Sequence, residues 1–247
     1  MTPSRRRTSP RPPERCIALT LLTFLLLLGS SACTQDKPHT PAVATTAPAL
    51  TTPQAELLAL TRFTNYRRGA AQVTADIPVQ GHLARLTGHL DWRHRTGLAI
   101  LKGNGGILEH GRHLLRWDHT TVSVQHNWTG HLPTRPPRHG WARRALTTRA
   151  STIDTTLLLL LNLAADRPDN ARLLLRSGAR RLGDEKVAGT PVTLFAGPSV
   201  TTSQAAAPEA GRTAEGRTRY WIDADGRLRR FSARLGGSTE WLVATFF

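Results

Sequence analysis

Histidine is the residue type in this sequence that comes nearest to a metal-binding pattern. Nine of the ten histidines lie between residues 82 and 139, and two occur in the run Glu109-His110-Gly111-Arg112-His113. In a strand His110 and His113 would point to opposite faces and could not bind one ion together. The sequence also lacks His-Glu-x-x-His. We therefore expect no metal site and interpret these histidines as surface residues.

Patterns typical of catalysis are absent from the sequence. It has no Gly-x-Ser-x-Gly, no phosphate-binding loop and no dinucleotide fingerprint. Asp223 and Asp225 are paired carboxylates by spacing alone, and their position beside Gly226 predicts a hairpin turn. We expect a protein that is not an enzyme and that binds no cofactor.

The stretch before Cys33 is the strongest functional signal. It begins with five arginines, continues through the apolar segment 16–28 and ends in Gly29-Ser30-Ser31-Ala32. A charged start, a short apolar core and small residues at the end are typical of a secretory signal peptide. The apolar run has roughly 13 residues, whereas a transmembrane helix needs about 20. We expect residues 1–32 to be removed and the rest of the chain to work outside the cytoplasm.

The end of this segment resembles the lipobox of bacterial lipoproteins, in which the cysteine after the cut receives a diacylglyceryl group. The resemblance implies that Cys33 is lipidated and holds the protein at the extracytoplasmic face of the cell membrane. Ser30 stands where that family usually has Leu. Because Ser30 and Ala32 also suit ordinary signal peptidase, a secreted protein with a bare Cys33 is the alternative.

The composition limits the partners and the covalent chemistry. The formal net charge is +16, and removing the five arginines and Glu14 of residues 1–32 leaves +12. Such a charge attracts anionic surfaces, of which phospholipid headgroups suit an extracytoplasmic protein better than nucleic acid. Abundant Arg, Ala, Gly, Pro and Thr also indicate a GC-rich genome, so part of the charge is compositional. With Cys16 in the signal peptide, the mature chain cannot form an intramolecular disulfide.

Apolar periodicity predicts the elements of one domain. Residues 33–52 have no such period and predict a Thr/Ala/Pro tether, and the domain occupies 53–247. We expect helices at 53–67, at about 151–163 and at 169–177. Alternating apolar residues from 73 to 92 predict a long half-buried antiparallel strand. Further strands are expected near 97–102, 107–117, 120–128 and 192–195, in a hairpin at 220–235, and at 241–247.

Two stretches carry a second resemblance. The passage from Leu174 to Thr193 and the hairpin text from Tyr220 to Arg230 resemble LolA-like lipoproteins of the LppX and LprG type. The resemblance implies an α+β fold, in which a curved antiparallel sheet, an incomplete β-barrel, wraps on a few helices. Some members of that family hold lipid acyl chains between sheet and helices.

On this basis we expect an apolar cavity between sheet and helix. Its expected lining is Leu86, Leu90, Trp92, Leu115, Trp117, Val122 and Val124 from the sheet, and Leu157, Leu159, Leu160 and Leu161 from a helix. A packed core would use the same residue types, so it is the alternative. The basic loop around Arg135, Arg138 and His139 is either a headgroup or membrane contact or an ordinary solvated loop.

The expected function is that of a monomeric, lipid-anchored lipoprotein of the cell envelope, which binds or carries a lipid, a glycolipid or another amphiphile. The alternative is a non-catalytic envelope sensor or protein-interaction module with a packed core.

Overall fold

The structure is a computed structural model that describes residues 47–103, 111–199 and 216–247. The first half of the described chain contains α1 (Thr52–Arg68), β1 (Ala70–Val79), β2 (His82–Asp91), β3 (Thr96–Lys102), β4 (Arg112–Trp117), β5 (Thr121–Gln125) and β6 (Ala142–Ala145). The second half contains α2 (Thr152–Asn162), α3 (Ala171–Arg176), β7 (Arg180–Val187), β8 (Thr190–Ala196), β9 (Thr218–Ile222), β10 (Leu228–Ala233) and β11 (Leu242–Phe246).

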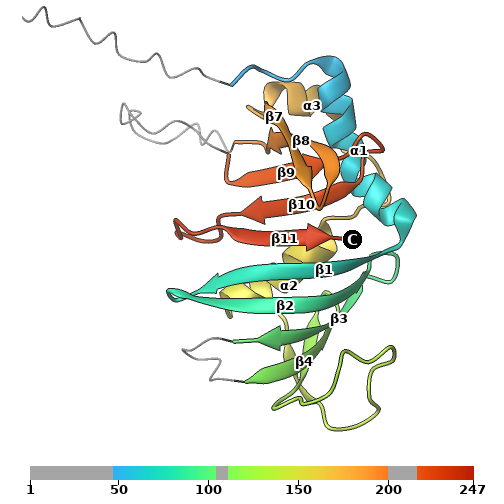
Figure 1. The fold of residues 1–247 in the computed structure, drawn as a ribbon, viewed down its shortest axis with the longest axis vertical. Coiled ribbons are helices and arrows are strands. Elements are labelled where there is room, and N and C mark those ends of the chain that lie inside the picture. Colours follow the sequence, from blue (N-terminus) through green and yellow to red (C-terminus); the bar gives the residue numbers. More distant parts are fainter. Residues whose placement is uncertain (1–46, 104–110, 200–215) are drawn as a thin grey trace, which may run out of the picture. The chain divides into compact units, whose positions relative to one another are not determined.

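The strands form one antiparallel sheet of eleven in the order β6-β5-β4-β3-β2-β1-β11-β10-β9-β8-β7 (Figure 1). Pairing of β1 with β11 joins the two halves of the chain, with Val73 opposite Phe246. β6 and β7 are the two edges, so the sheet is not closed. An open antiparallel sheet with a few helices was expected, although strands make up more of the fold than the α+β description suggests.

Local sequence explains where the helices begin. Thr51 is the N-cap of α1, where its side chain and that of Gln54 form a capping box, and Gly69 ends the helix with a φ of 83°. Ser151 is the N-cap of α2, and its Oγ accepts a hydrogen bond of 3.0 Å from the Asp154 N–H. These starts agree with the expected ones to within a residue.

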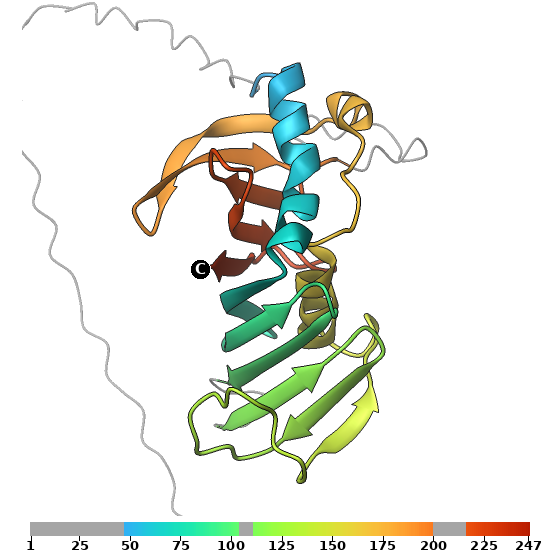
Figure 2. The same cartoon turned by 90° about the vertical axis from the view of Figure 1, so that its right-hand side faces the viewer.

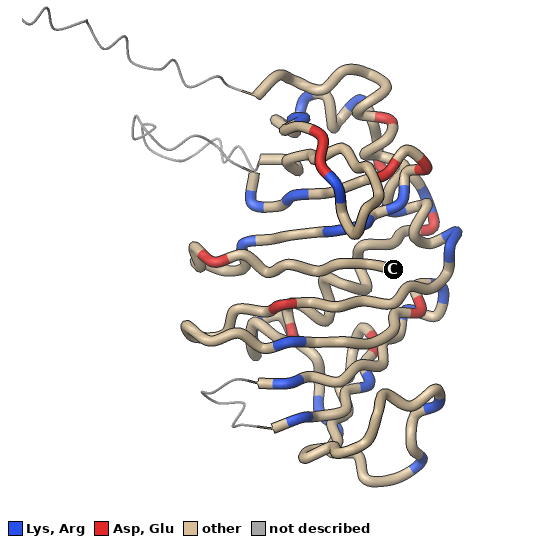
Figure 3. The backbone as a smooth tube through the Cα atoms, viewed as in Figure 1, with Lys and Arg blue, Asp and Glu red and all other residues tan. Residues whose placement is uncertain are grey.

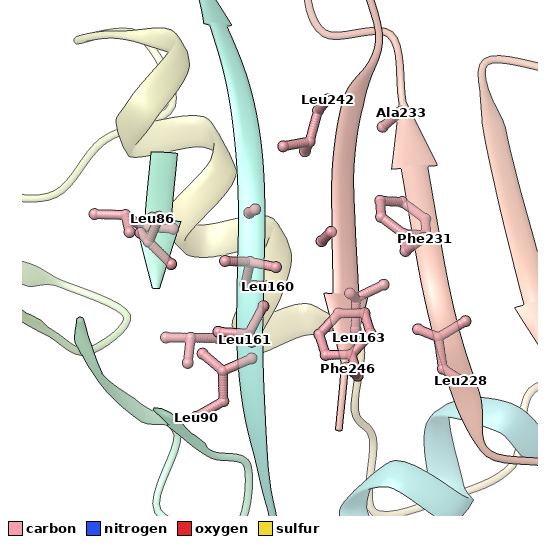
Figure 4. Close-up of a cluster of buried hydrophobic side chains, with 14 of the residues drawn as sticks. Leu86, Leu90, Leu160, Leu161, Leu163, Leu228, Phe231, Ala233, Leu242 and Phe246 are labelled. Atoms are coloured by element: carbon pink, nitrogen blue, oxygen red, sulfur yellow. The ribbon is translucent and has the colours of Figure 1, made fainter. Parts of the chain in front are cut away.

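Helix α2 packs against one face of the sheet, here called the inner face (Figure 2). Leu160 and Leu161 of α2 meet Leu86 and Leu90 of β2, with Phe246 nearby on β11 (Figure 4). All five side chains are at most 2% exposed. The five consecutive leucines of this helix are therefore explained mainly by burial against the sheet.

Two expectations about strands need correction. The alternating stretch from 73 to 92 is two strands, because Gln80 and Gly81 adopt φ values of 49° and 79° and turn the chain between β1 and β2. Strands β6 and β7 were not predicted, because their side chains are mostly exposed and show no apolar alternation.

The expected signal peptide and Cys33 lie outside the described residues, as does His110. At the end of the expected tether, Ala49 forms a β-bridge with Arg180 and Leu50 is buried. No helix in the described ranges is long and apolar enough to cross a membrane.

Candidate functional site

A cavity of about 680 Å³ lies between the inner face of β3–β6 and the first half of α2. Most of its wall is apolar, and much of that wall is made of short side chains. The apolar lining residues are Val79, Leu101, Leu115, Val122, Val124, Ala142, Ala150, Ile153 and Leu157. Val122, Val124 and Ala142 contribute only short side chains to the wall on the side of β5 and β6, and the space there is not filled.

An ion pair fixes the start of α2 against edge strand β6 beside the cavity. Asp154 has no exposed side-chain surface, and its two carboxylate oxygens accept hydrogen bonds of 2.7 and 2.6 Å from Arg144. The Ser151 hydroxyl donates a further bond of 3.1 Å to this carboxylate. These hydrogen bonds to Asp154 raise the pKa of the Arg144 guanidinium. The contacts hold one wall of the cavity in place.

Two buried tryptophans donate hydrogen bonds to the backbone of α2. Trp92 Nε1 donates to the Leu160 carbonyl at 3.0 Å, and Trp117 Nε1 donates to the Leu157 carbonyl at 3.1 Å. Gly97 leaves room for the Trp117 ring, since a Cβ there would lie 2.2 Å from a ring carbon. Both indoles are therefore buried with their polar N–H satisfied.

Two imidazoles lie in the lining where β4 and β5 meet the cavity. The His113 and His126 ring centroids are 5.2 Å apart, and the rings meet edge to face. His113 shares the inner face with Leu115, and His126 follows Val124 by two residues. His126 is exposed, whereas His113 is half-buried.

The expected lining residues separate into three groups. Four of them line this cavity: Leu115, Val122, Val124 and Leu157. Leu159 lines a second cavity of about 530 Å³ between α1, α3 and the end of α2. The other six lie in the adjoining packed core and line neither cavity: Leu86, Leu90, Trp92, Trp117, Leu160 and Leu161.

The second cavity is more polar, and its charged groups bind one another. Arg62 donates to Asp169 at 2.9 Å and to the Asn162 carbonyl at 2.9 Å. Next to it, the Asn65 amide donates to the Leu163 carbonyl at 2.8 Å. These bonds tie α1 to the segment between α2 and α3, so we interpret the second cavity as a structural junction.

Other expected features lie away from the cavity. Arg135, Arg138 and His139 belong to the loop after β5 and are not among the lining residues. The His139 carbonyl accepts a hydrogen bond from Gln125, which points away from the inner face. Asp223 accepts bonds from the Asp225 and Arg227 N–H groups, as expected for a turn. Within the described residues there is no cluster of three or more potential metal ligands.

Several lining residues were not expected from the sequence. Leu101 and His113 could have been found by strand parity, because they are register partners on the same face as Leu115. Arg144 and Ala142 could not have been found in this way, because the sequence of β6 does not alternate between apolar and polar residues.

Comparisons with known proteins were made for the whole chain. No protein-family model and no curated protein sequence matches it. A DUF1329 family protein from Desulfovibrio piger matches with 12% identity and a TM-score of 0.26, covering 79% of this chain and 91% of that chain. A domain described as outer membrane lipoprotein-sorting protein, from Vibrio parahaemolyticus, matches with 10% identity and a TM-score of 0.20, covering 72% and 82%. Neither structure tests the resemblance to the LppX and LprG type, and no activity is transferred from either one.

Proposed function

We propose that this protein binds an amphiphile, with the apolar part of the ligand in the cavity between β3–β6 and α2. The observation that carries the proposal is the cavity itself, about 680 Å³ and lined mainly by aliphatic side chains. Ligand pockets in proteins typically measure about 300–1,000 Å³ and are mostly apolar. A cavity of this kind favours a ligand over the packed core of a sensor or interaction module.

The binding mechanism would be desolvation. Each methylene of an acyl chain that leaves water for an apolar site contributes about 0.8 kcal/mol. Leu115, Val124 and Leu157 offer aliphatic surface for such a chain. Polar groups at the rim would remain available for a headgroup, and no bond of the ligand needs to be made or broken. We therefore propose a non-catalytic carrier or binding protein.

The location belongs to the same proposal. We propose that the chain is exported and anchored through a lipid on Cys33, with residues 34–46 as part of the tether. The support for this is the sequence pattern before Cys33 together with the high positive charge of the chain. A lipid-binding domain at an envelope membrane would then meet its ligand at the surface that holds it. We expect it to act as a monomer.

Native mass spectrometry of the full chain, purified from a lipid-containing host, tests the proposal. We expect the wild-type protein to carry a bound amphiphile. Val124→Trp should lose it, because Val124 is half-buried in the cavity wall and the larger ring would occupy the space. Leu83→Trp is the matched control, since Leu83 is 53% exposed and lines neither cavity. A wild-type protein that stays empty when offered lipids would contradict the proposal and favour the sensor or interaction module.

A further inference from the structure

Basic side chains line the cavity, and no acidic one does. Four of its lining residues are basic: His113, His126, Arg143 and Arg144. Asp154, the partner of Arg144, is fully buried and not part of the lining. We propose that the bound amphiphile has an anionic headgroup, a carboxylate or a phosphate, and that His113 and His126 bind it. This inference rests on the proposed function of the cavity.

The two imidazoles continue the apolar wall. His113 lies two residues from Leu115 along β4, and His126 lies two residues beyond Val124 in the turn that follows β5. Two residues of a strand span about 6.6 Å, so each ring stands next to an aliphatic side chain on the same face. A chain packed on Leu115 and Val124 would place its headgroup at the histidines.

One nitrogen of this pair has no hydrogen-bond partner. His113 Nδ1 is buried and has none among the described residues. Buried polar atoms are nearly always hydrogen-bonded, and an unpaired one is disfavoured. Because this atom has no accessible surface, the His113 ring has to turn toward the cavity before a carboxylate or phosphate oxygen can accept a hydrogen bond from a protonated Nδ1. The exposed ring of His126 can donate to the same headgroup from the solvent side.

The charges on the surrounding elements favour an anion. Lys102 on β3 and Arg112 on β4 are register partners on the face opposite His113. Arg143 and Arg144 come from β6, and the charge of Arg144 is offset by Asp154 of α2. The basic residues of the loop after β5, His131, Arg135, Arg138 and His139, do not line the cavity. Imidazoles as a class change charge between about pH 5 and pH 8, so binding of an anion should strengthen as the pH falls.

Isothermal titration of the full chain with three amphiphiles of equal chain length tests the inference. The probes are dodecanoate, dodecyl phosphate and uncharged dodecyl maltoside, each titrated at pH 6 and pH 8. At pH 6 we expect at least one anion to bind about tenfold tighter than the maltoside, as one or two charge-assisted hydrogen bonds predict. For dodecanoate, whose own charge changes little between the two pH values, the preference should shrink at pH 8. Whichever anion binds more tightly identifies the headgroup as carboxylate or phosphate.

Variants assign the effect to the two histidines. His113→Gln with His126→Gln should bring the affinity for both anions to that for the maltoside measured on the same variant. His89→Gln is the matched control, because His89 is exposed on β2 and does not line the cavity. Equal binding of all three amphiphiles at pH 6, or a preference that survives the double substitution, would overturn the inference while the proposed function stands. If no amphiphile binds, both fall.

Discussion

The two halves of α2 meet the same sheet in different ways. The C-terminal half packs Leu160 and Leu161 against β2 and β11, where the side chains are almost completely buried. The N-terminal half faces β3–β6 across a cavity, and Ile153 and Leu157 line it. Both regions are apolar, so composition does not separate them. The difference lies at the edge of the sheet, where Val122 and Val124 of β5 and Ala142 of β6 are the only apolar residues that these two strands contribute to the cavity wall.

The polar and charged groups also differ between the packed region and the cavity. In the described residues of the packed region, polar groups such as the Trp92 indole are satisfied by the helix backbone. Around the cavity, the lining includes His113, His126, Arg143 and Arg144. Lys and Arg residues are spread over the strands of both halves of the sheet (Figure 3). The proposed binding site depends on this contrast between a hollow end with basic lining residues and a closed apolar core.

Removing volume from the packed region should give the largest loss of stability. We expect Leu160→Ala to lower the free energy of unfolding by about 3 kcal/mol, because the side chain is fully buried and its neighbours cannot fill the space. Leu159→Ala, at a half-buried position of the same helix, should cost less than half as much. Urea unfolding of both variants measures the difference, and equal losses would contradict the contrast drawn here.

Larger side chains should destabilise the packed core more than the cavity wall. Ala244 on β11 is fully buried in the packed core, so Ala244→Leu should cost about 2 kcal/mol through overpacking. Val124→Leu adds one methylene at the cavity wall and should change stability by less than about 0.5 kcal/mol. Thermal unfolding of the pair tests this expectation. A similar loss in both variants would mean that the cavity wall is as tightly packed as the core.

Breaking the ion pair beside the cavity should have a smaller effect. Removing one partner of a buried ion pair costs about 3–5 kcal/mol of stability. Arg144 is 50% exposed, so water can reach Asp154 once the arginine side chain has been removed. We therefore expect Arg144→Gln to cost about 1 kcal/mol in urea unfolding. Arg143→Gln removes the same charge from the neighbouring exposed position and should be nearly neutral.

The smallest expected effect depends on pH. Asp118 lies in the turn between β4 and β5, and its carboxylate accepts a hydrogen bond of 2.8 Å from the Thr120 N–H and another from the Thr120 hydroxyl. These hydrogen bonds lower the pKa of Asp118. Because the pKa of Asp118 is lower in the folded state, its carboxylate stabilises the protein at pH values above the unfolded pKa of about 3.9. This stabilisation is lost as the pH falls through the folded-state pKa. Asp118→Asn should therefore lower the melting temperature slightly at pH 7 and not at pH 2.5. An equal difference at both pH values would contradict the assignment.

Periodicity predicted the inner face of the sheet and both helix starts, because burial and capping are local in sequence. It did not reveal β6 or β7, because edge strands such as Ala142–Ala145 are held by backbone hydrogen bonds and carry exposed side chains. It identified Leu115 and Leu160 as inward-facing but could not tell which one faces a cavity. That depends on the volumes of residues such as Val124 and Ala142, which become register partners only in the folded chain.

The most direct test is a crystal structure of the full chain with a bromine-labelled amphiphile, 12-bromododecanoate. We expect one anomalous bromine peak between Val122 of β5 and Leu157 of α2, with the carboxylate at His113 and His126. Bromine in the second cavity between α1 and α3, or only on the outer face of the sheet, would contradict it.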